Sequence, residues 1–292
     1  LDDSLTAGPT MAVARSSPTT TRLPDGRVLV VGADSAELFD PSGDSFTAVP
    51  GSPNLPFGQA AALLADGRVL LVGASPGGPV ATFYDPAGNS FAPGPSPLLD
   101  PDLGGLDPGG HTLTRLPDGR VLLVGGCPCA SVGGPIFSSD FAQVYVPGSN
   151  GWQQVGDMTE DRFGHTATLL PTGKVLLIGG DDDADLIEQT TAEIFDPNGN
   201  TFTSLSAQLP APHGRHTATL MPSGSVLVIG GDQAATELFI GGGAHAVAGP
   251  SSQIGRERHS ATTLLDGQVL VAGGESVASG YLDSAELYDP AT

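Results

Sequence analysis

The stretch "LPDGRVLVVG" at residues 23–32 recurs along the chain and decides the fold. It returns as "LADGRVLLVG" at 64–73 and "LPDGRVLLVG" at 116–125, and three altered copies follow: "LPTGKVLLIG", "MPSGSVLVIG" and "LLDGQVLVAG". In each copy a short turn ending in Gly separates two apolar segments, which is typical of a β-hairpin. No segment shows a helical period. The six copies therefore predict six hairpins of one repeating architecture.

A third apolar segment follows every hairpin, and an aromatic residue marks a fourth segment in most copies. The third segments are "AELFDP" (36–41), "ATFYDP" (81–86), "AQVYVP" (142–147), "AEIFDP" (192–197), "TELFIG" (236–241) and "AELYDP" (285–290). The aromatic residues of the fourth segments are Phe46, Phe91, Trp152 and Phe202. Four antiparallel strands in a unit of roughly 50 residues describe one blade of a β-propeller.

Taken together, these segments resemble the Kelch repeat family. The family is marked by a Gly-Gly pair after the second strand and by aromatic residues in the third and fourth strands. The pairs here are Gly125-Gly126, Gly179-Gly180, Gly230-Gly231 and Gly273-Gly274. Blades one and two depart from this pattern with Gly32-Ala33 and Gly73-Ala74, and blade five lacks the fourth-strand aromatic. The resemblance covers essentially the whole chain and implies an all-β, six-bladed propeller.

We expect residues 1–292 to form this one domain. The predicted blades span approximately 12–55, 56–99, 107–158, 159–210, 211–254 and 255–292. Residues 1–11 match a fourth strand, because Leu5 precedes Met11 by the same interval as Trp152 precedes Met158. We expect this segment to close the ring by completing blade six, which would leave no open edge between the first and last blades.

The charge of the chain limits its partners. Its 292 residues include 11 Lys and Arg against 32 Asp and Glu, which gives a net charge of −21. Such a field repels nucleic acid and anionic membrane surfaces. No apolar segment reaches the roughly 18 residues of a membrane span. We expect a bacterial, secreted or cell-surface protein that is a monomer or a domain of a larger exported protein.

One face of the predicted propeller is elaborated and the other is uniform. The turns between first and second strands are short in every copy, whereas the second-to-third connections vary, as in residues 127–141 and 181–191. An insertion at 98–110 lies on the same side. Elaborated loops on a rigid scaffold usually carry binding. Neutral drift of unconstrained loops is the alternative.

Polar residues gather where the innermost strands begin, at the mouth of the central channel on that face. The candidate binding residues are Arg15, Gln59, His111, Arg162, His165, Arg215, His216, Arg258 and His259. They indicate either a site for a small or anionic ligand or a structural ring that satisfies backbone carbonyls of the next blade. A metal shared by the histidines is disfavoured, because the symmetry of a propeller separates them.

Two loop motifs suggest further chemistry. Asp181, Asp183 and Asp185 alternate in "DDDADLIE", and alternating carboxylates suit Ca²⁺. A solvated acidic loop is the other interpretation of this motif.

Cys127 and Cys129 flank one proline in the longest second-to-third connection, either as a disulfide or as two thiols.

Known Kelch enzymes offer three comparisons. Galactose oxidase-like proteins use two Tyr and two His at copper, but Tyr84, Tyr145 and Tyr288 fall in third strands and only Tyr281 in a loop. The iron-binding spacing of nitrile-specifier proteins is not found. A mutarotase-like activity needs only a few polar groups, for which Glu257 is available beside Arg258 and His259.

We expect a non-catalytic binding or scaffold module that recognises a protein or glycan through its loop-rich face. The alternative is an enzyme, mutarotase-like or oxidase-like, that acts on a small sugar-like substrate at the channel mouth. Apart from calcium, no cofactor is expected.

Overall fold

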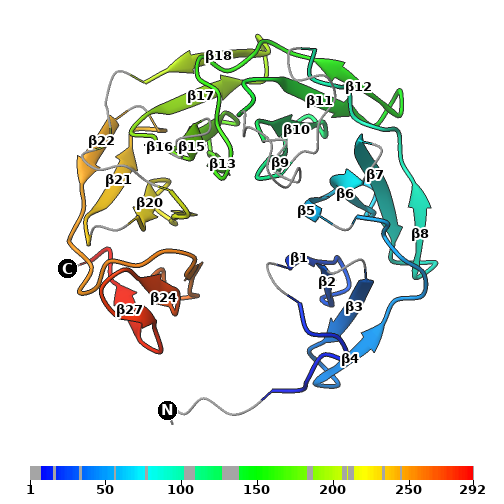
Figure 1. Cartoon of the computed structure of the whole chain (residues 1–292), viewed down its shortest axis with the longest axis horizontal. Coiled ribbons are helices and arrows are strands. Elements are labelled where there is room, and N and C mark those ends of the chain that lie inside the picture. The colour runs from blue at the N-terminus through cyan, green and yellow to red at the C-terminus, as the bar shows by residue number, and fades with distance from the viewer. Residues whose placement is uncertain are drawn as a thin grey trace.

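The chain forms an all-β propeller whose blades are arranged around a central axis (Figure 1). The structure is a computed structural model, and it describes residues 8–15, 18–32, 35–55, 57–75, 78–101, 109–126, 138–182, 187–205, 209, 214–231, 234–243 and 245–291. Each blade is an antiparallel meander in which strands pair in chain order. Within the described ranges there is no helix, and hence none that could span a membrane.

The bounds of the strands follow the repeats of the sequence. Blades one to three contain β1 (Thr19–Arg22), β2 (Val28–Gly32), β3 (Ser35–Asp40) and β4 (Ser45–Ala48); β5 (Phe57–Leu63), β6 (Val69–Ser75), β7 (Gly78–Asp85) and β8 (Ser90–Pro93); and β9 (Thr112–Arg115), β10 (Val121–Val124), β11 (Ala142–Val146) and β12 (Gly151–Gln154). Blades four to six contain β13 (Thr166–Leu169), β14 (Val175–Ile178), β17 (Ala192–Asp196) and β18 (Thr201–Ser204); β19 (Thr217–Leu220), β20 (Val226–Ile229), β21 (Thr236–Ile240) and β22 (His245–Ala248); and β23 (Ser260–Thr263), β24 (Val269–Ala272) and β27 (Ala285–Tyr288).

Blade six differs from the other five, because its sheet has three strands in the part of the chain that the structure describes. The closing strand expected from the sequence is not among them. Residues 8–11 form no strand, and Leu5 lies outside the described residues. The six-bladed architecture is thus confirmed, whereas closure by the N-terminal segment stays a prediction.

The repeated Pro-Asp-Gly motif makes the turn between the first two strands of a blade. In blade one the N–H of Leu23 donates to the carbonyl of Arg27 at 2.8 Å, and the N–H of Gly26 donates to the carbonyl of Leu23 at 3.0 Å. Gly26 has φ of +93°, a conformation that favours glycine. The Asp25 carboxylate accepts from the backbone N–H and the side chain of Arg27. The motif recurs because each hairpin needs this turn.

The core is divided among the blades, and each part is shared by two neighbours. Leu29 and Val31 of blade one pack with Val69 and Leu71 of blade two in one buried cluster. The same arrangement joins each later blade to the next, up to blades five and six. The second strands β10, β14 and β20 are buried along their whole length, since both of their faces are covered. This explains why the second strand is the most apolar part of the repeat.

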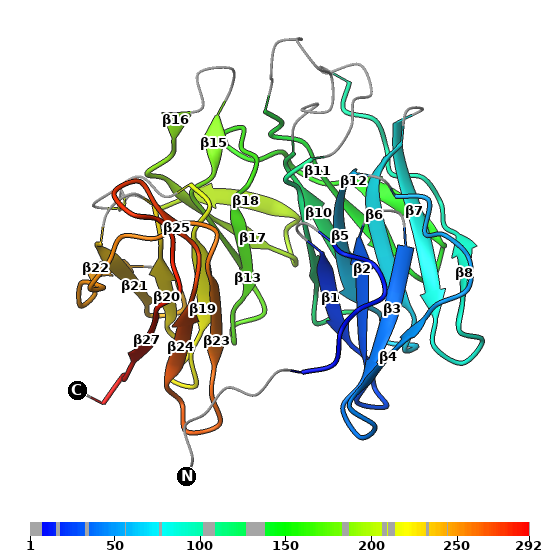
Figure 2. The same cartoon turned by 60° about the horizontal axis from the view of Figure 1, so that its bottom comes forward.

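Two further hairpins lie at the end of the propeller that carries the second-to-third connections. They are formed by β15 (Asp181–Asp182) with β16 (Ile187–Glu188) and by β25 (Glu275–Ser276) with β26 (Gly280–Tyr281). Figure 2 shows β15 and β16 at the upper end, opposite the turns between first and second strands. The second-to-third connections of blades four and six therefore lie at the end where the sequence predicts them.

The Gly-Gly pair allows the segment that precedes the first strand of the blade to approach the end of the second strand closely. A Cβ on Gly180 would lie 2.7 Å from the carbonyl oxygen of Phe163 and 3.1 Å from the backbone nitrogen of His165. Gly180 also has φ of +96°. We expect Gly180→Ala to destabilise the fold by about 2–4 kcal/mol through steric overlap and backbone strain.

Thermal unfolding measures this effect, with Gly148→Ala as the matched control. Gly148 has no atom within 4 Å of its Cβ position, so its substitution should leave the melting temperature almost unchanged. Equal melting temperatures for both variants would show that the pair has no such packing role.

Candidate functional site

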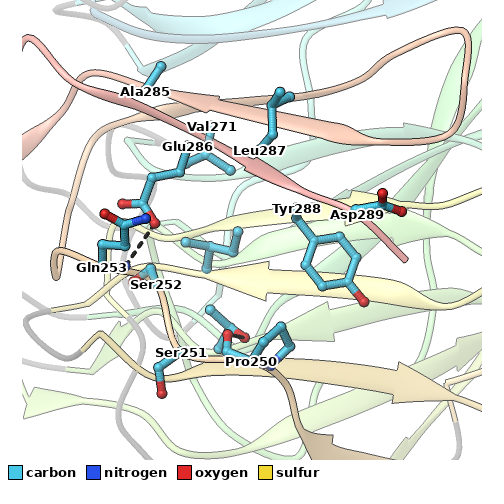
Figure 3. Close-up of a pocket in the computed structure, with 12 residues that line it drawn as sticks. Pro250, Ser251, Ser252, Gln253, Val271, Ala285, Glu286, Leu287, Tyr288 and Asp289 are labelled. Atoms are coloured by element: carbon cyan, nitrogen blue, oxygen red, sulfur yellow. Dashed lines mark hydrogen bonds between the residues drawn. The ribbon is translucent and has the colours of Figure 1, made fainter. Parts of the chain in front are cut away.

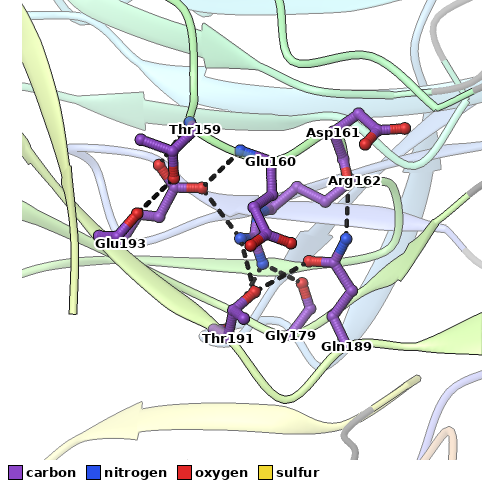
Figure 4. A network of polar contacts seen from close by, with 9 residues as sticks. Thr159, Glu160, Asp161, Arg162, Gly179, Gln189, Thr191 and Glu193 are labelled. Carbon is purple, nitrogen blue, oxygen red and sulfur yellow. Dashed lines mark hydrogen bonds and ion pairs between the residues drawn. The ribbon is translucent and has the colours of Figure 1, made fainter. Parts of the chain in front are cut away.

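In three blades, an arginine from the loop before the first strand binds a glutamate of the third strand. Arg162 is fully buried, and its guanidinium donates to the carbonyl of Gly179 at 2.6 Å and to the carboxylate of Glu193 at 2.9 Å (Figure 4). Glu193 also accepts from the backbone N–H groups of Thr159 and Glu160. These bonds fix the loop that enters blade four to strand β17.

Blades one and six repeat this arrangement. Arg15 pairs with Glu37 at 2.6 Å, and Arg256 pairs with Glu286 at 2.6 Å. The side chains of Arg15 and Arg256 have no exposed surface. Of the predicted binding residues, Arg15 and Arg162 are therefore placed in buried ion pairs, where a ligand on the surface does not reach them. The paired glutamates lie far along the sequence, so the motif that contains the arginine does not reveal this role.

The histidines form bonds between neighbouring blades. His165 Nε2 lies 2.9 Å from Thr112 Oγ1, and His216 Nε2 lies 2.8 Å from Thr166 Oγ1. His259 Nε2 lies 2.8 Å from Thr217 Oγ1. In every case the threonine directly follows the histidine position of the preceding blade. In blades four and five the His-Thr dipeptide thus provides a histidine toward one neighbour and a hydroxyl toward the other.

His111 is buried at the same position of blade three, and Gln59 lies at that of blade two, beside Gly32. The four histidines are between 4% and 7% exposed, so they belong to the wall between blades and not to an open surface. Burial lowers the pKa of His165 well below its usual range, and the nearby Arg162 lowers it further. Burial and Arg256 lower the pKa of His259 to about 4. Both imidazoles are neutral at pH 7.

Arg215 and Arg258 are placed differently from the buried arginines. Their side chains are 46% and 55% exposed, and each directly precedes a histidine of the ring. Both have left-handed backbones, with φ of +50° and +53°. Blades two, three and four have glycine at this position, with φ of +54° at Gly58, +69° at Gly110 and +66° at Gly164. An arginine in this conformation is strained by roughly 1 kcal/mol or more.

The two exposed arginines are neighbours across the boundary of blades five and six. The N–H of Arg258 donates to the carbonyl of Arg215 at 3.0 Å. Arg215 contacts Glu257 at 3.4 Å through one nitrogen, and Arg258 forms a close ion pair with Glu275 through one nitrogen. The remaining donors of both guanidinium groups have no acceptor among the described residues.

The hairpin β25–β26 borders this pair of arginines. Glu275 reaches Arg258, and its cross-strand partner is Tyr281. Paired residues of antiparallel strands project to the same face, so Tyr281 lies on the face of the hairpin that carries Glu275. Tyr281 is 91% exposed and Val277 is 84% exposed. Glu275 thus connects the exposed Arg258 with the hairpin that carries the exposed Tyr281.

Of the three predicted calcium ligands, the structure describes only Asp181. Asp181 is buried in β15, and its backbone exchanges two hydrogen bonds with Phe163. Asp183 and Asp185 lie outside the described residues, as do Cys127 and Cys129. Within the described ranges, no group of three His, Cys, Asp or Glu residues is arranged to hold a metal ion. The calcium site stays a prediction.

The low pKa values of the histidines predict acid sensitivity. The unfolded chain takes up protons near pH 6.5, whereas His259 in the folded chain takes one up only near pH 4. Stability should therefore be full above pH 6.5 and fall as the pH is lowered toward 4. We expect His259→Gln to flatten this fall, because glutamine does not titrate and already occupies the equivalent position of blade two.

Melting temperatures between pH 4 and pH 8 test the prediction. His245→Gln is the control, since His245 is exposed on β22 and outside the ring. A variant at His259 with the same pH profile as the wild type would contradict the assignment.

Comparison with known proteins supports the fold alone. No protein-family model and no curated protein sequence matches the chain. Among solved structures, YjhT is similar with a TM-score of 0.68 and 17% identity over 94% of this chain and 95% of that one. A fungal alcohol oxidase of the AA5 family, solved in complex with copper, has a TM-score of 0.72 and 19% identity over 94% of this chain. This chain spans 62% of that oxidase, and at these identities both structures share with it the architecture of a β-propeller.

Tyr84, Tyr145 and Tyr281 are not arranged as the tyrosine ligands of a copper site. Tyr84 and Tyr145 are fully buried, and their hydroxyls donate to Asn89 and Asn150. Tyr281 is exposed on the β25–β26 hairpin. Among the arginines and histidines of the predicted polar ring, Arg215 and Arg258 have exposed side chains, whereas the others are buried.

Proposed function

We propose that the protein is a binding module that recognises an acidic glycan or acidic sugar at its loop-rich face. The observation that carries this proposal is the conformation of Arg215 and Arg258. Three other blades use glycine where these two use arginine, so the fold does not require a side chain at this position. An unfavourable backbone that is retained where glycine would fit points to a role for the side chain.

The chemistry of the surroundings favours a carboxylate ligand. Arginine presents several donors in one plane and binds carboxylates through two parallel hydrogen bonds. Each of the two arginines contacts one glutamate through a single nitrogen, so the other donors of its guanidinium face away from that pair. Tyr281 adds a large, rigid surface that the ring of a sugar would cover.

The binding test compares acidic sugars with their neutral counterparts, such as glucuronate with glucose and galacturonate with galactose. We expect calorimetry to detect the acid and not the neutral sugar, and added salt to weaken binding. Loss of a charge-assisted hydrogen bond costs about 1.5–3 kcal/mol, so Arg215→Gly or Arg258→Gly should weaken binding about 10- to 100-fold. Chemical conversion of the bound sugar would assign the site to an enzyme instead.

The matched control is Arg115→Gly, which removes the same charge from an exposed position at the other end of β9. It should leave affinity unchanged. Equal affinities of the wild type and the double variant Arg215→Gly, Arg258→Gly for every acidic sugar that binds would refute the proposed site.

The strained backbone gives a second, independent prediction. Arg215→Gly and Arg215→Ala remove the same guanidinium, but only glycine relieves the left-handed strain. We expect the glycine variant to melt at least as high as the wild type and above the alanine variant, by roughly 1 kcal/mol or a few degrees. Thermal unfolding at neutral pH measures this order, and an alanine variant that melts above the glycine variant would contradict it.

A further inference from the structure

A cavity between blades four and five lies at the end of the propeller that carries the short turns, and its volume is about 430 Å³. Another cavity, of about 460 Å³, follows the edge of β27 that has no partner strand in the described part of the chain (Figure 3). The three-stranded sheet of blade six accounts for the cavity along β27. Blades four and five each have four strands, so the cavity between them needs a different explanation.

The cavity between blades four and five has an apolar part and a polar part. Ile194 and Leu205 line it from blade four, and both pack against the core cluster that the two blades share. Lys174, at the end of the turn between β13 and β14, supplies a cation. Gly241 and Gly242, from the turn between β21 and β22 of blade five, form another wall. The volume lies within the range of small-molecule sites.

The turn between β21 and β22 lacks an acceptor that the same turn has in other blades. In blades one, two and four, a carboxylate at the start of this turn accepts the N–H of the residue two positions later. These carboxylates belong to Asp40, Asp85 and Asp196. Blade five has Ile240 at this position, since Phe239 before it pairs as Phe195 does. Within the described ranges, the N–H groups of Gly241 and Gly242 donate to no acceptor.

The glycines of this turn hold it close to blade four. Gly241, Gly242 and Gly243 all have left-handed backbones, with φ of +64°, +72° and +87°. A Cβ on Gly243 would lie 2.9 Å from Leu170 Cδ1, and one on Gly242 would lie 3.1 Å from Thr172 Cγ2. Glycine therefore permits both the conformation and the close contact. Successive backbone N–H groups of a turn form a concave site for an anion.

Lys174 also leaves hydrogen-bond donors at the cavity. Its equivalent in blade three, Arg120, donates across the next boundary to the carbonyl of Pro197 at 2.7 Å and to Asn200 at 2.8 Å. Lys174 pairs instead with Asp196 of its own blade, at 2.9 Å. An ammonium group has three N–H donors, and the other two have no acceptor within the described part of the chain. The boundary of blades four and five thus lacks the bridge that Arg120 provides between blades three and four.

The unused polar groups of the cavity are therefore donors. The carboxylate of Asp196 already accepts from Lys174 and from the N–H of Asn198 at 3.0 Å. A ligand that matches the cavity brings acceptor oxygens for the donors and a carbon part for the apolar wall.

We propose that this cavity binds a small organic ester of phosphate or sulfate. The oxyanion accepts from Lys174 and from the backbone N–H groups of Gly241 and Gly242, and the carbon part of the ester contacts Ile194 and Leu205. Charge-assisted bonds of this kind are the stronger class of hydrogen bond. The site is independent of Arg215 and Arg258, which lie at the opposite end of the propeller.

Calorimetry with phenyl phosphate tests the site, in the double variant Arg215→Gly, Arg258→Gly so that the loop-rich end does not contribute. We expect a Kd on the order of 1 mM, because Lys174 is 43% exposed and the net charge of −21 opposes anions. Benzyl alcohol, which has the ring without the oxyanion, should not bind. No binding of phenyl phosphate, or equal binding of both compounds, would overturn the proposal.

Ile240→Asp, made in the same double variant, tests the backbone donors. The new carboxylate should accept the N–H of Gly242, as in blades one, two and four, and should repel the ligand, so we expect affinity to fall at least about 10-fold. The matched control is Ser149→Asp, which adds the same charge at an exposed position in the equivalent turn of blade three and should leave affinity unchanged. Equal affinities of the Ile240→Asp chain and its parent would refute the assignment.

A second measurement locates the ligand without a substitution in the cavity. Lys174 is the only lysine of the chain, so acetylation of an ε-amino group reports on this site alone. At about three times the Kd, roughly three quarters of the sites are filled, and acetylation of Lys174 should slow about fourfold. Mass spectrometry measures this rate, with the α-amino group as the internal control. An unchanged rate at Lys174 would overturn the proposal, whatever the tests with acidic sugars show.

Discussion

Burial of the second strand between two neighbouring blades is the constraint on which the rest of this structure depends. A single four-stranded sheet leaves two apolar faces, and each needs another sheet to cover it. In the described part of the chain, every core cluster combines residues of two adjacent blades. No blade therefore has a core of its own, and the repeated hairpin acquires its stability from repetition.

Polar groups add the order that apolar burial lacks. The hydrophobic effect itself is non-directional. The Thr-His bonds between blades and the Arg-Glu pairs within blades fix relative positions through hydrogen bonds of defined geometry. A buried ion pair contributes little net stability when its desolvation is counted, but removal of one partner leaves a charge unpaired. These residues thus contribute more to the relative positions of the blades than to the net stability of the fold.

The architecture could be predicted from sequence because its signals are local and repeated. The Asp-Gly turn, the apolar second strand and the Gly-Gly pair each lie within one short segment. The apolar strand recurs in all six copies, and the turn and the pair each recur in four. The roles of the polar ring could not be separated in this way. Arg162 is buried because Glu193 lies on another strand, and no local feature distinguishes it from an exposed arginine. The signal for Arg215 and Arg258 was present, however, since alignment of the blades places them with Gly58, Gly110 and Gly164.

The left-handed position before each histidine of the ring also allows the residues at the rim of the propeller to differ from blade to blade. A Cβ at Gly164 would meet no atom closer than 3.9 Å, whereas one at Gly110 would lie 2.8 Å from the backbone nitrogen of Gly164. A side chain is therefore admissible in blade four and sterically blocked in blade three. In each blade, the space around this Cβ position decides which side chains can be placed at the rim. The strands that form the ring need not change.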